Sequence, residues 1–188
     1  MKKINLDNGG FSLAEAIITV AILIYTLVAL LVLFNNYSKI YNYQQTKIKI
    51  GNSAREAVKE LRSAALQANQ IVVSHDFFGT IYDTDQDTLV LKIPSIDGSG
   101  NIISEKYDYV VFYTTGKNLY RLIEVDAASS RSSGINQISD AVETITFAYD
   151  NTNLSLAIKI DADLEMQETS GGQNAVYQLH QKIYLRNK

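Results

Sequence analysis

Three aspartates that alternate along a short segment have the residue type and spacing of calcium ligands. Asp83, Asp85 and Asp87 resemble the first oxygen ligands of a calcium-binding loop. The EF-hand pattern would then require Gly at position 88 and Glu at position 94, where Thr88 and Pro94 stand. We therefore interpret the segment as a solvated turn that leads into a strand, with calcium binding as the alternative.

Hydrolytic chemistry has a weaker basis in the sequence. His75, Asp76 and His180 could form a triad with a serine, but the nucleophile motif Gly-x-Ser-x-Gly does not occur. We therefore predict no catalytic, cofactor-binding or metal-ligating residue and no cofactor. A membrane-anchored hydrolase is kept as a minor alternative.

The one charged side chain in a long apolar run is Glu15. Residues 11–34 are otherwise uncharged and mostly apolar. At about 1.5 Å per helical residue they can cross a hydrocarbon core of about 30 Å. A soluble helix is rarely apolar on every face, so this run is predicted to be a membrane helix. A carboxylate at the centre of such a helix costs about 2.5–3.5 kcal/mol, which indicates a specific role for Glu15.

A short polar leader, residues 1–10, precedes the run and contains Lys2, Lys3 and Asp7. A secretory signal would have a shorter apolar region followed by a small-residue cleavage site, and no such site follows residue 34. The leading lysines place the leader on the cytoplasmic side of the membrane. We therefore expect a single-pass protein of the cytoplasmic (inner) membrane with residues 35–188 outside the cytoplasm.

The segment Gly10-Phe11-Ser12-Leu13-Ala14-Glu15 resembles the signal of type IV prepilins and of type II secretion pseudopilins. That family shows Gly before the cleaved bond, usually Phe after it, and Glu as the fifth mature residue. The resemblance covers about the first third of the chain. It implies that a prepilin peptidase cleaves after Gly10 and methylates the new amine of Phe11, and that Glu15 acts in assembly.

The resemblance also implies a fold and a set of partners. We expect an α+β, pilin-like fold in which one long N-terminal helix packs on an antiparallel sheet. The expected partners are the prepilin peptidase, other pilin or pseudopilin subunits, an inner-membrane assembly platform, and lipid before assembly. Many members carry a proline in the apolar half of the helix, whereas the only proline here is Pro94. That difference favours a minor pilin or pseudopilin.

The remaining chain is predicted to form one extracytoplasmic domain, residues 35–188. An apolar stripe at residues 54, 58, 61, 65, 68 and 72 predicts an amphipathic helix to about residue 70, with Gly51 as a weak point. Strands are expected at residues 88–93, 107–113, 119–125, 144–149, 154–160 and 176–185. Residues 107–113 and 119–125 should form a hairpin. Loops are expected at residues 127–134 and 165–174, and a short helical or irregular link at residues 135–142.

Tyrosines gather on one face of the strand predicted at residues 107–113. Tyr107, Tyr109 and Tyr113 share this face with Val111, because side chains alternate along a strand. We interpret them as cross-strand packing, with contact to a partner as the alternative.

Composition excludes some functions. The net charge is −3, which argues against a broad nucleic-acid surface, and the absence of cysteine excludes a disulfide or thiolate site. The sequence therefore predicts a structural, non-enzymatic filament subunit. The alternative is a ligand- or DNA-binding tip subunit, or adhesin, that would use the sheet and the loop at residues 127–134.

Overall fold

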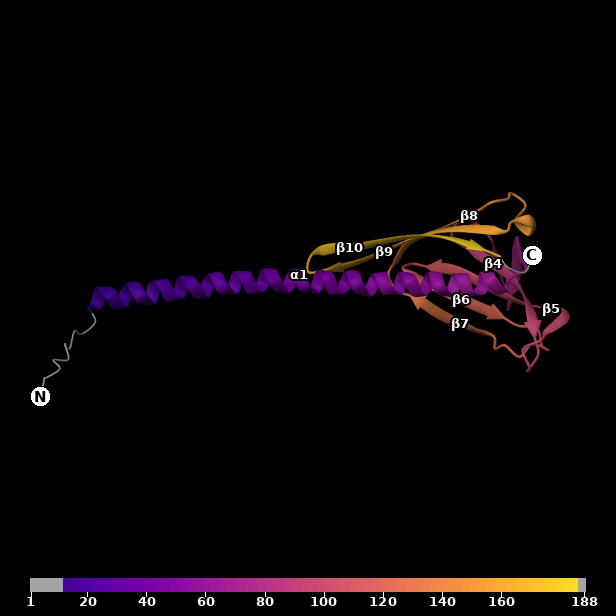
Figure 1. The fold of residues 1–188 in the computed structure, drawn as a ribbon, viewed down its shortest axis with the longest axis horizontal. Helices are drawn as coiled ribbons and strands as arrows, with labels where there is room; N and C mark the ends of the chain where they lie inside the picture. Colours follow the sequence, from indigo (N-terminus) through magenta and orange to yellow (C-terminus); the bar gives the residue numbers. More distant parts are fainter. Residues whose placement is uncertain (1–11, 186–188) are drawn as a thin grey trace, which may run out of the picture. The chain divides into compact units, whose positions relative to one another are not determined.

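The computed structural model describes residues 12–185 and consists of two units, residues 1–42 and 43–188. One helix, α1 (Leu13–Gln67), begins in the first unit and ends in the second (Figure 1). Its last turn lies close to the predicted end at about residue 70. All strands of the described residues belong to the second unit.

In the described residues, ten strands and one 3-10 helix follow α1. They are β1 (Gln70–Ile71), β2 (Ser74–Phe77), β3 (Thr80–Asp83), β4 (Leu89–Ile96), β5 (Ile102–Thr115), β6 (Asn118–Glu124), β7 (Gly134–Ser139), β8 (Val142–Tyr149), η1 (Leu154–Leu156), β9 (Lys159–Ser170) and β10 (Gln173–Tyr184).

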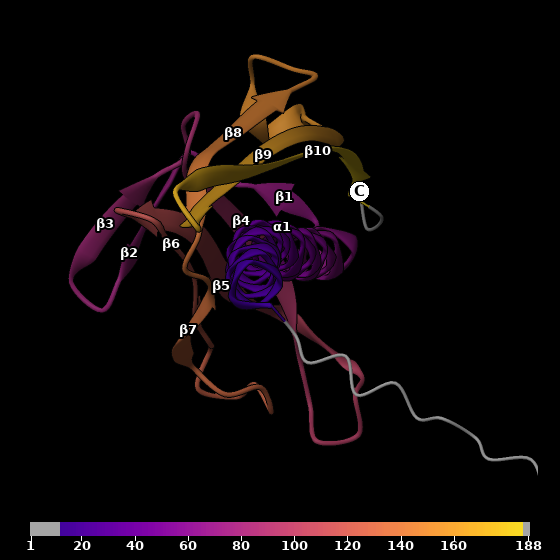
Figure 2. The ribbon, with the colours of Figure 1, turned by 90° about the vertical axis from the view of Figure 1, so that its left-hand side faces the viewer.

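The strands form three antiparallel sheets. Their orders are β1-β4-β5-β6-β7, β10-β9-β8 and β2-β3. Within the second unit, α1 lies between the five-stranded and the three-stranded sheets (Figures 1 and 2). The predicted α+β class, with a helix packed on antiparallel sheets, is confirmed.

The core of the second unit forms where one stripe of α1 meets both sheets. Ile50, Ala54, Val58, Leu61 and Ala65 recur at three- and four-residue steps and are buried. They join buried side chains of β4, β5, β8, β9 and β10 in one cluster. The alanines in this stripe are small, which lets the sheets approach the helix closely.

Gly51 was predicted to be a candidate weak point of the helix. The helix is continuous through Gly51, which is buried. A Cβ at this position would lie 3.2 Å from Cε2 of Tyr177 on β10. The glycine therefore gives the Tyr177 ring room to lie against the helix.

Two predicted irregular segments are strands instead. Residues 135–142 contain most of β7, which pairs with β6. Residues 165–174 complete β9 and β10, which pair through Gln173 and Ser170 around a turn at Gly171 and Gly172. Both glycines have positive φ, 60° and 79°, as a tight hairpin turn requires. Backbone pairing holds these polar segments in place.

Other strand boundaries differ by a few residues. The predicted hairpin of residues 107–113 and 119–125 is confirmed as β5 and β6. The strand predicted to stop at Pro94 continues to Ile96 as β4. The proline is tolerated because β1 pairs with β4 only at Leu91 and Lys92, so β4 is an edge strand at Pro94. The strand predicted from residue 154 begins at Lys159, after η1.

Because the described apolar cluster lies entirely within the second unit, we expect residues 35–188 to fold without a membrane. Circular dichroism should show mixed helix and sheet, with a cooperative thermal transition. A fragment that begins at residue 68 serves as the control, because it lacks the buried face of α1 and should not fold. A noncooperative transition for residues 35–188 would contradict the prediction.

Candidate functional site

Glu15 lies in the first turn of α1, where it forms a reciprocal cap with Ser12. The Glu15 carboxylate oxygen Oε2 accepts hydrogen bonds from the backbone N–H and the hydroxyl of Ser12, both at 2.9 Å. The backbone N–H of Glu15 in turn donates to Ser12 Oγ at 3.3 Å. This is the capping-box arrangement, which satisfies amides that have no partner inside the helix. Glu15 therefore has a local role in starting α1.

The part of α1 that follows Glu15 is exposed on every face in the isolated chain. The large apolar side chains of residues 13–34 are between 52% and 80% exposed. Two threonine hydroxyls in this segment donate to backbone carbonyls one turn earlier, Thr19 to Glu15 at 2.7 Å and Thr26 to Ile22 at 2.5 Å. Such bonding leaves few polar groups that need water. Within residues 12–185, α1 is the helix long and apolar enough to cross a membrane.

The predicted processing residues Gly10 and Phe11 lie outside the described residues. Ser12 and Glu15, which belong to the same motif, lie at the start of α1. Cleavage after Gly10 stays a prediction.

The aspartates considered as calcium ligands form a turn. Asp85 Oδ1 accepts hydrogen bonds from the backbone N–H groups of Asp87 and Thr88 at 3.0 and 2.9 Å, just before β4. Asp83 is the last residue of β3. No group of three or more His, Cys, Asp or Glu side chains in residues 12–185 is placed to hold a metal ion.

The two histidines lie on different sheets and pair with different carboxylates. His75 Nε2 on β2 lies 3.0 Å from Glu124 Oε2, and His180 Nδ1 on β10 lies 2.6 Å from Asp163 Oδ1. Among the hydrogen bonds of the described residues, none joins a serine to either histidine. The hypothetical triad of His75, Asp76 and His180 is therefore not assembled.

Two of the tyrosines of β5, Tyr109 and Tyr113, pack against rings of other strands, which supports the packing interpretation. Tyr113 stacks on Tyr120, its partner on β6, with ring centroids 5.5 Å apart. Tyr109 stacks on His75 at 3.6 Å, and Lys92 Nζ lies 3.7 Å from the centroid of Tyr107. Burial, helped by a hydrogen bond with the Tyr82 hydroxyl, raises the pKa of Tyr113 to about 12.

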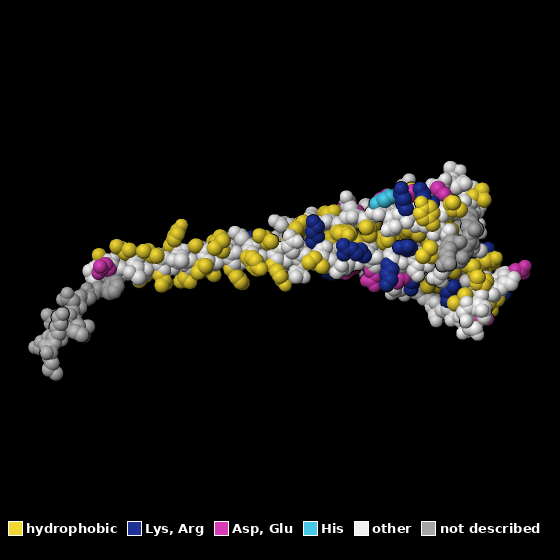
Figure 3. Space-filling view, viewed as in Figure 1, with side chains coloured by type: hydrophobic (Ala, Val, Ile, Leu, Met, Phe, Trp, Pro, Cys, Tyr) yellow, Lys and Arg dark blue, Asp and Glu magenta, His cyan; other side chains and the backbone are white. Residues whose placement is uncertain are grey.

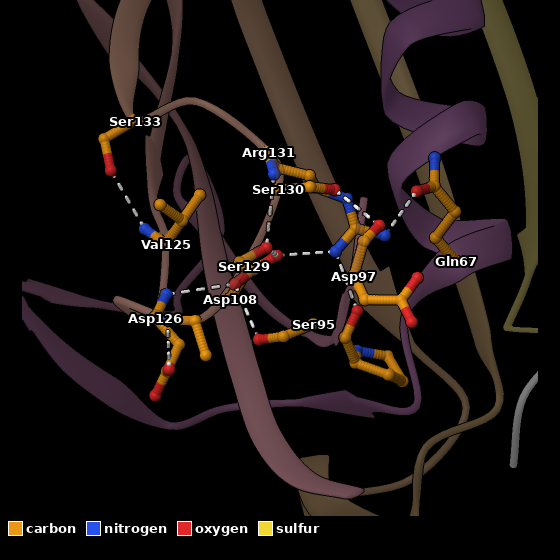
Figure 4. A network of polar contacts seen from close by, with 12 residues as sticks. Gln67, Ser95, Asp97, Asp108, Val125, Asp126, Ser129, Ser130, Arg131 and Ser133 are labelled. Atoms are coloured by element: carbon orange, nitrogen blue, oxygen red, sulfur yellow. Dashed lines mark hydrogen bonds and ion pairs between the residues drawn. The ribbon is translucent and has the colours of Figure 1, made fainter. Parts of the chain in front are cut away.

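Residues 127–134, predicted to be a loop of small residues, are bound to a buried carboxylate. Asp108 on β5 is fully buried and accepts hydrogen bonds from Ser95 Oγ at 2.7 Å, Ser129 Oγ at 2.8 Å and the Asp126 N–H at 3.0 Å. Arg131 Nη1 pairs with Asp108 Oδ2 at 2.5 Å (Figure 4). The single carboxylate of Asp108 therefore accepts from all four donors.

Arg131 links the same loop to two further elements. It donates to the carbonyl of Pro94 on β4 at 2.7 Å and to the Gln67 side chain at the end of α1 at 3.2 Å. Sequence reasoning missed this network. The signal was Asp108 inside an otherwise apolar and aromatic strand, since a carboxylate buried there needs a charged partner.

In the second unit, then, a helix packs on antiparallel sheets. The same helix begins in an exposed apolar segment that is able to cross a membrane. These features define a pilin-like architecture. No protein-family model matches the chain, and no curated protein matches its sequence.

Proposed function

We propose that this chain is a structural, non-enzymatic subunit, a minor pilin or pseudopilin, of a type IV pilus-like filament or type II secretion pseudopilus. One observation carries the proposal. The exposed apolar segment of α1 contains Glu15 as its only charge and directly follows the signal-like residues Gly10 and Phe11.

The proposed mechanism is mechanical. Subunits wait in the inner membrane, with residues 13–34 surrounded by lipid. During assembly these helices leave the lipid and pack against one another in the core of the filament. The large exposed side chains of this segment would then be buried among neighbouring helices.

The proposed partners follow from that mechanism. A prepilin peptidase would remove the leader, an inner-membrane assembly platform would move the subunit out of the lipid, and sibling subunits would surround its helix. The folded second unit would stay outside the cytoplasm throughout.

Mass spectrometry of the native protein tests the processing step. In cells that contain a prepilin peptidase, the mature chain should begin at Phe11 with a methylated amine and remain in the membrane fraction. Gly10→Leu places a bulky side chain at the cleaved bond and should retain the leader. An intact Met1 terminus in the unsubstituted chain, or cleavage after Phe34, would contradict the proposal.

A further inference from the structure

The turn between β2 and β3 displays a phenylalanine in a backbone conformation that a bulky residue rarely adopts. Phe78 has φ 53° and precedes Gly79, which has φ 91°. The left-handed region suits Gly and Asn, which have no bulky side chain to clash with the backbone. The Phe78 side chain is nevertheless 65% exposed. Neither turn formation nor core packing accounts for this residue.

The hairpin that carries Phe78 is anchored from its inner face. Phe77 is buried and its ring meets Tyr82 edge-on, with centroids 5.6 Å apart. The outer face carries the exposed Ile81 beside its cross-strand partner Asp76, with Asp83 further along. There is no Lys or Arg in residues 63–91. The β2–β3 hairpin is therefore anchored by its inner face and carries an apolar side chain at its turn, with acidic side chains beside it.

A groove that is complementary to this hairpin, with an apolar floor and basic edges, lies beside α1 and β10 in the second unit. Its volume is about 230 Å³, and it is lined by Gln44, Lys47, Ile48, Gly51, Arg55 and Tyr177. Ile48 is 57% exposed and the Tyr177 ring lies against Gly51, so the floor is largely apolar.

Two cations flank this floor. The Arg55 guanidinium carbon lies 5.7 Å from the centroid of the Tyr177 ring, and the Arg55 side chain also donates to Asn52. Among the ion pairs of residues 12–185, neither Arg55 nor Lys47 has a carboxylate partner. Basic side chains are visible along this part of the surface in Figure 3.

We propose that Phe78 of one copy of this chain inserts into the groove at Tyr177 of a second copy. The aromatic tip would cover Ile48 and the Tyr177 ring, while Asp76 and Asp83 would approach Lys47 and Arg55. The two surfaces differ, so the contact is heterologous: the first copy keeps a free groove and the second copy keeps a free hairpin. Such a contact continues from copy to copy and builds an open helical array. The inference rests on the proposed function, to which it adds a contact between folded domains.

Site-specific crosslinking of the full chain in membranes tests the contact, and the natural absence of cysteine removes any background. Chains carrying Phe78→Cys are coexpressed with chains carrying Ile48→Cys and then oxidised. A disulfide-linked dimer of the two variants is expected. Ile135→Cys, at an equally exposed apolar residue on β7, replaces Phe78→Cys in the control and should give no dimer with Ile48→Cys. Crosslinking of Phe78→Cys only to itself, or only to another protein, would overturn the inference.

Three substitutions separate binding from folding. Phe78→Asn should weaken self-association of the full chain in detergent by about tenfold or more, because the buried ring is lost. Its thermal midpoint should stay equal or rise, since Asn tolerates the left-handed conformation. Lys47→Glu should also reduce the crosslink, and Asp83→Lys in the hairpin chain should restore it. A lowered midpoint with unchanged association would contradict the contact.

Formation of the crosslink and formation of filaments are measured separately, so that failure of the contact can be told from failure of the proposed function. If the wild-type chain forms filaments but the Phe78→Cys and Ile48→Cys chains give no crosslink, the contact is overturned and the proposed function stands. A crosslink in membranes from cells that form no filaments, despite a complete assembly machine, would support the contact and remove the proposed function.

Discussion

Glu15→Gln should reduce incorporation of the chain into filaments by about tenfold or more, while cleavage, membrane insertion and domain folding stay unchanged. Removal of the leader would create a positive amine at Phe11. Glu15 lies four residues further on, about 6 Å along the helix axis. A neighbouring subunit displaced by about that distance would bring its Glu15 to this amine, so each incoming chain would neutralise a buried charge. Glutamine cannot supply the charge.

The capping box of Glu15 and Ser12 offers a competing explanation, and matched variants separate the two. Glutamine can take the place of glutamate in a capping box, so Glu15→Gln removes the charge and keeps the cap. Ser12→Ala removes the cap and keeps the charge, at about 0.5–2 kcal/mol of helix stability. Glu15→Ala removes both.

Filament pull-downs that compare the three variants with wild type decide between charge and cap. The charge mechanism expects low incorporation for Glu15→Gln and Glu15→Ala, and near-normal incorporation for Ser12→Ala. Normal incorporation of Glu15→Gln would assign Glu15 to capping alone. Undiminished incorporation of all three variants would remove both roles from assembly and leave the processing prediction in place.

Asp108→Ala should lower the free energy of unfolding of the second unit by about 3–5 kcal/mol. The substitution leaves the Arg131 guanidinium, whose side chain is 21% exposed, without its carboxylate. It also removes the acceptor shared by Ser95, Ser129 and the Asp126 amide. Denaturant unfolding measures the loss. Amide hydrogen exchange should also become faster in residues 125–133, because the Asp108 carboxylate bonds this segment to β5.

The same carboxylate should make stability depend on pH in the acidic range. Burial opposes ionisation of Asp108, but the hydrogen bonds from Ser95, Arg131, Ser129 and the Asp126 amide together outweigh it, so the pKa is lowered. A lowered folded-state pKa stabilises the fold fully above the unfolded value of about 3.9. This contribution is lost as pH falls through the folded-state pKa. Asp108→Asn should therefore show a shallower loss of stability below about pH 4.

Asp163→Asn is the control, because the Asp163 side chain is 63% exposed and pairs only at the surface, with His180. Its effect should stay within about 1 kcal/mol. Equal effects of the Asp108 and Asp163 substitutions would show that the buried network contributes little.

Elements with local sequence signals could be predicted before the fold was known. The all-round apolar run of residues 11–34 indicates a membrane-capable helix, and the stripe through Ala54, Val58 and Leu61 indicates the face that α1 buries. Both are properties of a single segment and its 3.6-residue period. The β5–β6 hairpin belongs to the same class, since its two strands are separated only by a short turn.

Elements that depend on distant partners became evident only in the folded domain. The first four residues of β7 are exposed, so they show no alternating pattern of burial, and pairing with β6 makes the segment a strand. The polar ends of β9 and β10 are held by mutual pairing and by the ion pair of Lys49 with Glu168, at 3.1 Å.

The same limit applies to single residues. Asp108 reads as a polar interruption of a strand until Arg131, 23 positions later, is brought against it. Gly51 reads as a weak point in a helix until the ring of Tyr177 is seen against it. The composition of a segment and the period of its apolar residues show which of its side chains must be buried. Which charge, ring or strand satisfies that need is decided by contacts between segments far apart in the chain, and those contacts exist only in the folded domain.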